Sequence, residues 1–174
     1  TPVTEDEFRS KSVKDLTNAT YDAAIADYKA RMVYVAETAF PVISNVFENQ
    51  GHMFSSIQVP FTDGIRQMTV VCDLKEAYES QGKTLIKDFE KSVVLTLIDD
   101  NWKEHLRDVD DLRKTSQNAV YEQKDPLVVY KQESFMIFQR MLDTVNKEII
   151  SFLFKGELPN AQKEESVEET ESAQ

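Results

Sequence analysis

Histidine and cysteine, the residues most often used as transition-metal ligands, are rare in this chain. Its 174 residues include two histidines, His52 and His105, and one cysteine, Cys72. The histidines lie far apart and lack the His-Glu-x-x-His spacing of a zinc protease, and one cysteine is too few for a structural zinc site. We therefore predict no metal site. We expect His105 to be packed or half-exposed and Cys72 to be a small residue of a hairpin.

Motifs that bind nucleotides or activate a nucleophile are absent from the sequence. It contains no G-x-x-x-x-G-K-[ST] phosphate loop, no G-x-G-x-x-G and no G-x-S-x-G. The acidic pairs Asp99-Asp100 and Asp110-Asp111 lie in helical patterns, where carboxylates are mostly solvated. We therefore predict that the chain alone is not an enzyme and that it binds no cofactor.

The charge and composition of the chain exclude several classes of partner. The net charge is −11, which disfavours binding to nucleic acid or lying flat on an anionic membrane. No apolar stretch reaches the roughly 18 residues of a membrane span, and no signal peptide is visible. A single cysteine excludes an intrachain disulfide and suits a reducing cytoplasm. Because the chain begins with threonine rather than methionine, we expect it to be a piece of a longer protein.

The first fifty residues have a helical pattern. A capping box at Thr4 and Glu7 predicts a helix start, and one long helix or two shorter ones fit residues 5–50, with a possible break near Asn18. Pro41 predicts a kink or a new start. Apolar residues recur three or four positions apart at Tyr21, Ile25, Tyr28, Met32, Val35 and Ala39.

The next segment, 53–73, changes to a strand pattern. Two β-prone runs flank Thr62-Asp63-Gly64, and Asp-Gly in this position predicts a β-hairpin. Pro60 cannot donate a ladder hydrogen bond and so predicts an edge strand. A short polar helix near 74–81 should follow and end at Gly82.

Two long helices are predicted in the rest of the chain. Residues 84–113 keep a mostly helical apolar spacing, and a polar break follows at 115–119. Asp125 as a cap and Pro126 in the first turn predict the start of a second helix that ends near residue 155. Together they predict an antiparallel helical hairpin over 84–155. The fold class is therefore mainly α, with additional helices packed on this hairpin and a small β-hairpin insertion.

Several sequence blocks between residues 89 and 153 resemble a known family. They occur in this order: D-N-W-K-E-H-L at 100–106, D-L-R at 111–113, Y-E-Q-K-D-P at 121–126, Y-K-Q-E-S-F at 130–135 and Phe138. These blocks are similar to the two-helix finger and adjoining helical scaffold of SecA, the preprotein-translocase motor ATPase family. The family's glycine-containing run at the finger tip is missing here, because Leu112-Arg113 is followed by 114–120 without a glycine.

The resemblance implies a function in protein secretion. SecA couples ATP hydrolysis in its motor domains to the movement of unfolded secretory preproteins through the SecYEG channel, and its finger tip contacts the moving chain. By motif match, Tyr121 is the tip tyrosine and Lys124 is the lysine of Q-K-D-P. Contacts between 84–113 and the motor domains, which restrain the ATPase, are also implied. So is a location in the cytoplasm and peripherally at the inner face of the cell membrane. ATP and a C-terminal zinc module are expected only in the longer protein.

The resemblance also implies a domain organisation. Residues 1–52 are expected to be helices of the helical wing, and 53–82 a β-hairpin insertion with a short helix and no assigned role. Residues 83–155 are expected to form the scaffold and two-helix finger, and 156–174 a disordered acidic tail.

The residue types suit a finger that must contact chains of any sequence. An exposed tyrosine offers a large contact area at low entropic cost. Asp125 and Pro126 would fix the position of Tyr121 by fixing the start of the second helix. Trp102 and Leu106 are expected to be structural core residues. The predicted packing joins Trp102, Leu106, Val109 and Leu112 to Phe135, Phe138, Met141 and Leu142.

A second hypothesis is a free-standing helical scaffold or adaptor that binds partner helices. Any antiparallel helical pair has apolar stripes, a capped restart and an occasional loop tyrosine, so these features alone do not separate the two. An upstream reading frame with a phosphate loop and motor motifs would favour the SecA hypothesis. A start codon just before Thr1 would favour the adaptor.

Overall fold

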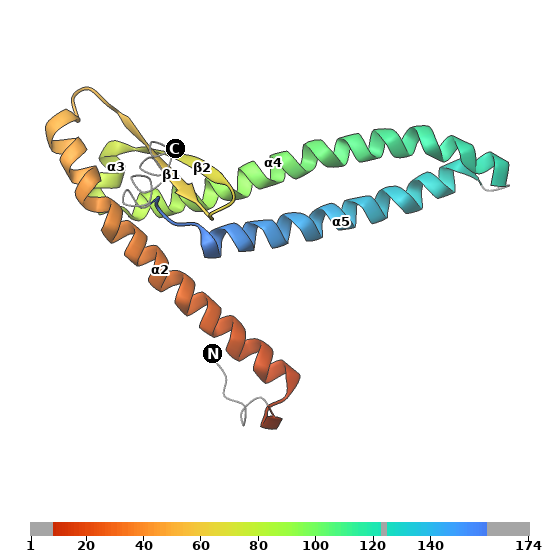
Figure 1. Cartoon of the computed structure of the whole chain (residues 1–174), viewed down its shortest axis with the longest axis horizontal. Helices are drawn as coiled ribbons and strands as arrows, with labels where there is room; N and C mark the ends of the chain where they lie inside the picture. Colours follow the sequence, from red (N-terminus) through yellow and green to blue (C-terminus); the bar gives the residue numbers. More distant parts are fainter. Residues whose placement is uncertain (1–8, 123–124, 160–174) are drawn as a thin grey trace, which may run out of the picture. The chain divides into compact units, whose positions relative to one another are not determined.

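A computed structural model describes residues 9–122 and 125–159, most of which are helical (Figure 1). The elements are α2 (Val13–Gln50), β1 (Ser56–Thr62), β2 (Gln67–Asp73), α3 (Leu74–Glu79), α4 (Lys83–Thr115), the 3-10 helix η1 (Ser116–Glu122) and α5 (Pro126–Lys155). The predicted fold class, mainly α with a small β-hairpin, is confirmed.

The chain forms two compact units, each assembled from segments that are far apart in the sequence. Of the described residues, the first unit takes 9–60, 69–88 and 157–159, and the second takes 61–68, 89–122 and 125–156. The second unit thus contains most of α4, all of α5 and the turn of the β-hairpin.

The helix α2 begins at Val13, after a break at residues 11 and 12 that follows helical residues 9 and 10. Its N-cap is Ser12, whose hydroxyl oxygen accepts a hydrogen bond from the Asp15 backbone N–H at 3.3 Å. The predicted capping box lies outside the described residues. From Val13 the helix continues through Asn18 to Gln50, so the possible break near Asn18 is not found and the chain breaks at residues 11 and 12 instead. Pro41 lies inside this helix, so the predicted new start at Pro41 is not found.

The core of the first unit lies along one face of α2. Tyr78 of α3 stacks on Phe47 of α2, with ring centroids 4.2 Å apart, and its hydroxyl is 3.4 Å from a carboxylate oxygen of Glu48. After α3 the chain turns through Gly82, which has φ of +84°. The buried apolar side chains of this unit are Met32, Val35, Ala36, Ala39, Ile43, Val70, Cys72, Leu74, Ala77 and Leu85.

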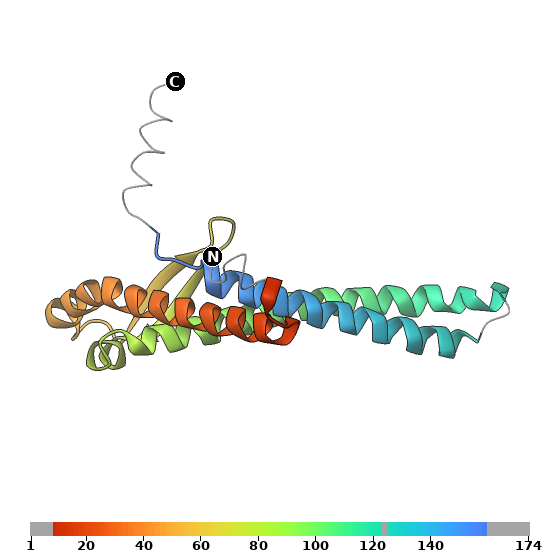
Figure 2. The ribbon, with the colours of Figure 1, turned by 90° about the horizontal axis from the view of Figure 1, so that it is seen from below.

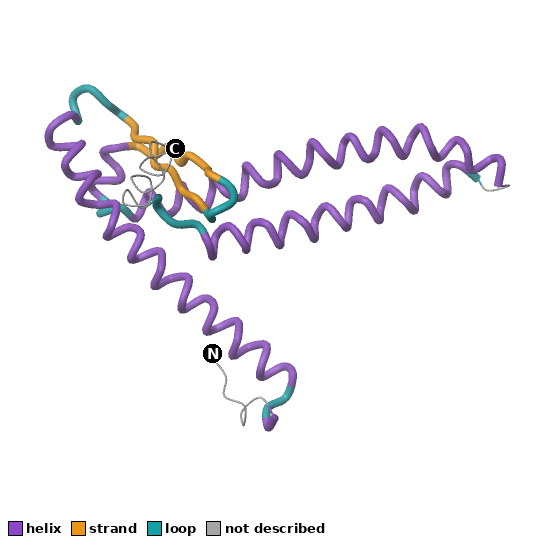
Figure 3. Tube along the Cα trace, in the orientation of Figure 1, coloured by secondary structure: helices purple, strands orange, loops and turns teal. Residues whose placement is uncertain are grey.

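The predicted β-hairpin is confirmed as a two-stranded sheet of β1 and β2 (Figure 3). Residues 63–66 connect the strands. One carboxylate oxygen of Asp63 accepts hydrogen bonds from the N–H of Ile65 (2.9 Å) and of Arg66 (2.7 Å). Gly64 supplies the positive φ, +85°, that the turn requires. In a two-stranded sheet both strands are edge strands, which is the environment predicted for Pro60.

The predicted helical hairpin is confirmed as α4 and α5, which lie side by side in the second unit (Figures 1 and 2). Asp125 is the N-cap of α5, where its carboxylate accepts from the Leu127 N–H at 2.8 Å, and Pro126 is the first helical residue. The short helix α3, predicted at 74–81, is observed at Leu74–Glu79.

The base of the helical hairpin, next to the β-hairpin turn, is closely packed. The ring of Phe89 stacks on Phe61 at 4.3 Å between centroids and lies 6.2 Å from Phe152. These three side chains, with Val93 and Leu97, are at most 2% exposed. Gly156 ends α5 against this cluster, since a Cβ there would come within 2.9 Å of the Phe89 ring.

Further along the hairpin, Val109, Leu112 and Met141 are half-buried. The expectation that Trp102 and Leu106 are core residues, however, is wrong. Trp102 is 44% exposed and Leu106 48%, whereas His105 is 8% exposed. The line of α4 residues that faces α5 has a spacing of four and consists of Phe89, Val93, Leu97, Asn101 and His105. Trp102 and Leu106 each follow a residue of this line, so they lie on the adjoining side of the helix. Their predicted partners Phe135, Phe138 and Leu142 are 60%, 38% and 43% exposed.

Candidate functional site at the tip of the helical hairpin

The tip of the helical hairpin is built by η1, which contacts α5. A 3-10 helix has three residues per turn, so Ser116 and Ala119 share one side, and both are buried, at 8% and 9% exposure. The Ser116 hydroxyl donates to the carbonyl oxygen of Arg113 at 3.2 Å, which ties η1 to the last turn of α4. The segment predicted as a polar break is therefore an ordered helical turn.

Tyr121 comes two residues after the buried Ala119 of η1, and its side chain is exposed to solvent. It is 89% exposed, and Val120 beside it is 63% exposed. The first turn of α5 adds Leu127 and Val128, at 58% and 48% exposure. We call Val120, Tyr121, Leu127 and Val128 the tip residues. Lys124, the other predicted contact residue, lies outside the described residues.

The charges next to the tip lie in the last turn of α4. Arg113 and Lys114 are there, where cations interact favourably with the helix dipole. The Lys114 ammonium lies 2.9 Å from the Asp111 carboxylate, and this hydrogen bond raises the pKa of Lys114. The tip therefore combines an exposed aromatic ring and aliphatic side chains with cations on the adjoining turn.

Metal-binding clusters and membrane-spanning helices are both absent from the described part of the chain. Residues 9–122 and 125–159 hold no cluster of three or more His, Cys, Asp or Glu side chains that could bind a metal. The predicted solvation of Asp99, Asp100, Asp110 and Asp111 is confirmed, since all four are exposed. Within the same residues we find no helix with the length and hydropathy needed to span a membrane.

The two residues singled out for their chemistry, Cys72 and His105, are buried. Burial and the nearby Asp88 and Asp73 raise the pKa of the Cys72 thiol to about 11, so it is protonated and unreactive at neutral pH. His105 packs between Trp102, with centroids 5.2 Å apart, and Phe138, at 5.7 Å edge-on. Its Nδ1 has no hydrogen-bond partner in the described structure. The prediction of a packed histidine is confirmed.

Comparison with known proteins shows the same family as the sequence blocks. The family model "SecA Wing and Scaffold domain" matches residues 3–157. The protein translocase subunit SecA of Flavobacterium psychrophilum is 54% identical over 161 residues, which are 92% of this chain and 14% of that protein. The SecA subunit of Bacteroides fragilis is 46% identical over 168 residues, 97% of this chain and 15% of that protein.

These matches cover nearly all of this chain but only about one seventh of each relative's length. No solved structure matches the chain. The matched residues include the β-hairpin, both long helices and the tip. The chain therefore belongs to the SecA family, as a wing and scaffold domain.

Proposed function

We propose that this domain contacts the unfolded secretory chain as a SecA motor moves it into the SecYEG channel, and that Tyr121 makes the contact. The observation that carries the proposal is the position of Tyr121. It is 89% exposed in the turn between α4, of 33 residues, and α5, of 30 residues. The relatives named as translocase subunits support the role in protein transport.

The chemistry of the tip suits contact with chains of any sequence. A tyrosine ring has an apolar face for side chains and a hydroxyl for backbone groups, and it loses little conformational entropy on contact. Val120, Leu127 and Val128 add exposed aliphatic surface beside it. None of these side chains recognises a particular sequence through specific polar contacts, so the tip would not discriminate among secretory sequences.

The two helices would transmit force between the tip and the rest of the motor. A helix of 30 residues is about 45 Å long. The domain holds no motor motif of its own, so it would act mechanically rather than catalytically. It would work at the cytoplasmic face of the cell membrane, where SecYEG opens.

Contact with the motor domains would involve the exposed apolar face of the helical hairpin. Trp102 and Leu106 on α4, with Phe135 and Phe138 on α5, are large apolar side chains that are all at least 38% exposed. Exposed apolar patches often mark sites of contact with another protein. Through such a contact the hairpin would restrain ATP hydrolysis until a secretory chain is bound.

Cross-linking from position 121 tests the proposed contact. Tyr121→Cys in the longer SecA protein, bound to SecYEG with a stalled secretory chain, should form cross-links to that chain. Cys72 does not compete, because its thiol is buried and protonated. Tyr34→Cys serves as the matched control, since Tyr34 is also an exposed tyrosine, at 69%, but lies on α2. Equal cross-linking from both positions would contradict the assignment of the tip.

We also predict that Tyr121→Ala lowers translocation more than basal ATP hydrolysis. The substitution removes the ring from an exposed position and so leaves the fold intact. Translocation of a secretory protein into SecYEG vesicles should fall several-fold, and Tyr121→Phe should retain most of the rate because it keeps the ring. Unchanged export by Tyr121→Ala would refute the proposal.

A further inference from the structure

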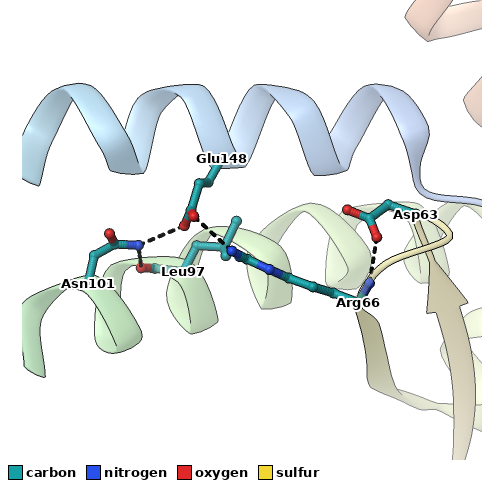
Figure 4. A network of polar contacts seen from close by, with 5 residues as sticks. All are labelled: Asp63, Arg66, Leu97, Asn101 and Glu148. Carbon is teal, nitrogen blue, oxygen red and sulfur yellow. Dashed lines mark hydrogen bonds and ion pairs between the residues drawn. The ribbon is translucent and has the colours of Figure 1, made fainter. Parts of the chain in front are cut away.

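The turn of the β-hairpin is bonded to both long helices through one carboxylate (Figure 4). Arg66 Nη2 donates to Glu148 Oε1 of α5 at 2.8 Å. Asn101 of α4 donates through Nδ2 to the other oxygen, Glu148 Oε2, at 2.9 Å. The same Asn101 amide also donates to the Leu97 carbonyl oxygen at 2.9 Å. Glu148 is thus held by two elements that are far apart in the sequence.

The backbone that carries Arg66 is fixed by its own turn. The Asp63 carboxylate accepts from the Arg66 N–H, and the Thr62 hydroxyl, 3.0 Å from the Arg66 carbonyl oxygen, donates to it. The Thr62 hydroxyl oxygen also accepts from the Gly64 N–H at 3.1 Å. Because the turn is held in this way, forming the pair with Glu148 costs little beyond the ordering of the Arg66 side chain.

The charges at this site favour the ionised pair. The hydrogen bond from Arg66 lowers the pKa of Glu148 and also raises the pKa of Arg66. Asp63 in the turn and Asp100 on α4 add negative charge that stabilises the Arg66 cation. The side chains are 48% and 28% exposed, so water screens the pair only in part.

This network lies in the closely packed section of α5. Glu148 lies between Val145 and Phe152, three and four residues away, which places the three on one face of the helix. Val145 and Phe152 are the residues of α5 that are buried in the described structure. Between Pro126 and Val145 no described residue of α5 is buried, although Phe138 contacts His105 and η1 contacts α5. The section that contains Glu148 therefore contributes strongly to the direction and register of that outer part.

We propose that Arg66 is a positioning residue: through Glu148 and Asn101 it fixes the register of α5 against α4, and thereby the place of Tyr121 at the far end. Glu148 lies 22 residues from Pro126, about 33 Å along the helix axis. At that distance a small slip or tilt at the base becomes a displacement of the tip. The β-hairpin turn thus acts as a brace for the finger.

Amide hydrogen exchange in the 174-residue chain tests the brace. Arg66→Gln should speed exchange about fivefold for the amides of residues 140–152, because the brace no longer opposes local opening. Arg107→Gln is the matched control. It removes an Arg–carboxylate pair of similar length, 2.7 Å, but one formed within α4 alone. Its effect on the same amides should be less than about twofold.

Two further variants separate the brace from a general loss of packing. The exchanged pair Arg66→Glu with Glu148→Arg should restore protection only in part, because Asp63 and Asp100, which favour a cation at position 66, repel a carboxylate there. Arg66→Lys keeps the charge with fewer donors and should give intermediate protection, and it also serves if Arg66→Gln does not fold. Equal exchange in the Arg66 and Arg107 variants would overturn the proposal.

The role of the brace in transport depends on the proposed contact at Tyr121. The exchange experiment does not depend on that contact. In the longer protein, Arg66→Gln should lower the yield of cross-links from position 121 relative to Arg107→Gln. Loss of exchange protection without a change in cross-linking would show that the brace does not position Tyr121. Absence of cross-links from position 121 with Arg66 intact would contradict the tip contact and leave the brace standing.

Discussion

Two glycines with nearly the same backbone conformation differ in their surroundings. Gly64 has φ of +85° and nothing within 4 Å of the place where a Cβ would be. Gly82 has φ of +84°, and a Cβ there would lie 2.9 Å from the carbonyl oxygen of Ala36. Gly64 is therefore required by conformation alone, and Gly82 by conformation and by the close approach of α2.

We predict that Gly82→Ala destabilises the chain more than Gly64→Ala does. Both substitutions place an alanine at positive φ, at a cost of about 1 kcal/mol. Gly82→Ala should cost at least about 1 kcal/mol more, because the backbone of α2 must move. Urea unfolding followed by circular dichroism measures both. Equal losses would show that the approach of α2 to this turn is not as close as described.

The side-chain contacts that stabilise α4 against α5 lie mainly at the base of the hairpin. Phe61 of the β-hairpin and Phe152 of α5 both lie against Phe89 of α4, and all three are at most 2% exposed. Beyond Leu97 the helices keep few buried side chains and many large exposed ones. The chain therefore concentrates its packing energy at one end of the hairpin.

We predict that Phe89→Ala lowers the free energy of unfolding far more than Phe135→Ala does. Removing a fully buried phenylalanine costs about 4 kcal/mol, through lost burial and the cavity that remains. Phe135 is 60% exposed, so its removal should cost less than about 1 kcal/mol in the isolated chain. The free energies of unfolding of the two variants test this. A large loss in Phe135→Ala would mean that the outer hairpin is packed after all.

Much of this architecture can be predicted from local sequence. Asp125-Pro126 marks the start of α5, Asp63-Gly64 the β-hairpin turn, and Gly82 the end of the short helix. Caps and turns depend on neighbours within three or four residues, so their chemistry is visible in a single sequence. The position of Tyr121 in the exposed turn follows from the same signals.

The direction of the side chains on α4 could not be predicted in this way. Trp102 and Leu106 are apolar, and apolarity alone favours burial, but the line of residues that faces α5 passes through Asn101 and His105 instead. Which line faces a partner helix is decided by tertiary packing. Arg66 and Glu148 are 82 residues apart, and no local pattern indicates a pair at that separation.

For the molecule as a whole, the brace predicts a dependence of stability on pH. The pKa of Glu148 is lowered from its ordinary value of 4.5, mainly by the hydrogen bond from Arg66. The pair therefore stabilises the folded chain fully above about pH 4.5, and this contribution is lost as the pH falls through the lowered pKa. Asp63, whose pKa is lowered by hydrogen bonds from the backbone of its own turn although burial opposes it, adds to the same trend.

Glu148→Gln tests this dependence. At pH 7 the variant should unfold at lower urea concentration than the parent chain, and the difference should shrink as the pH falls below about 4.5. Glu104→Gln is the control, because its pair with Arg107 lies on the surface of one helix and stabilises little. A difference between Glu148→Gln and the parent that persisted unchanged to pH 3 would show that ionisation of Glu148 is not its cause.

The exposure of Trp102 has an experimental consequence. It is the single tryptophan of the chain, 44% exposed, and its ring lies 5.2 Å from that of His105. Indole fluorescence shifts to shorter wavelength when water leaves its surroundings. Trp102 is therefore an intrinsic fluorescent probe of the surface proposed to contact the motor domains. A blue shift in its emission would register docking there without any added dye.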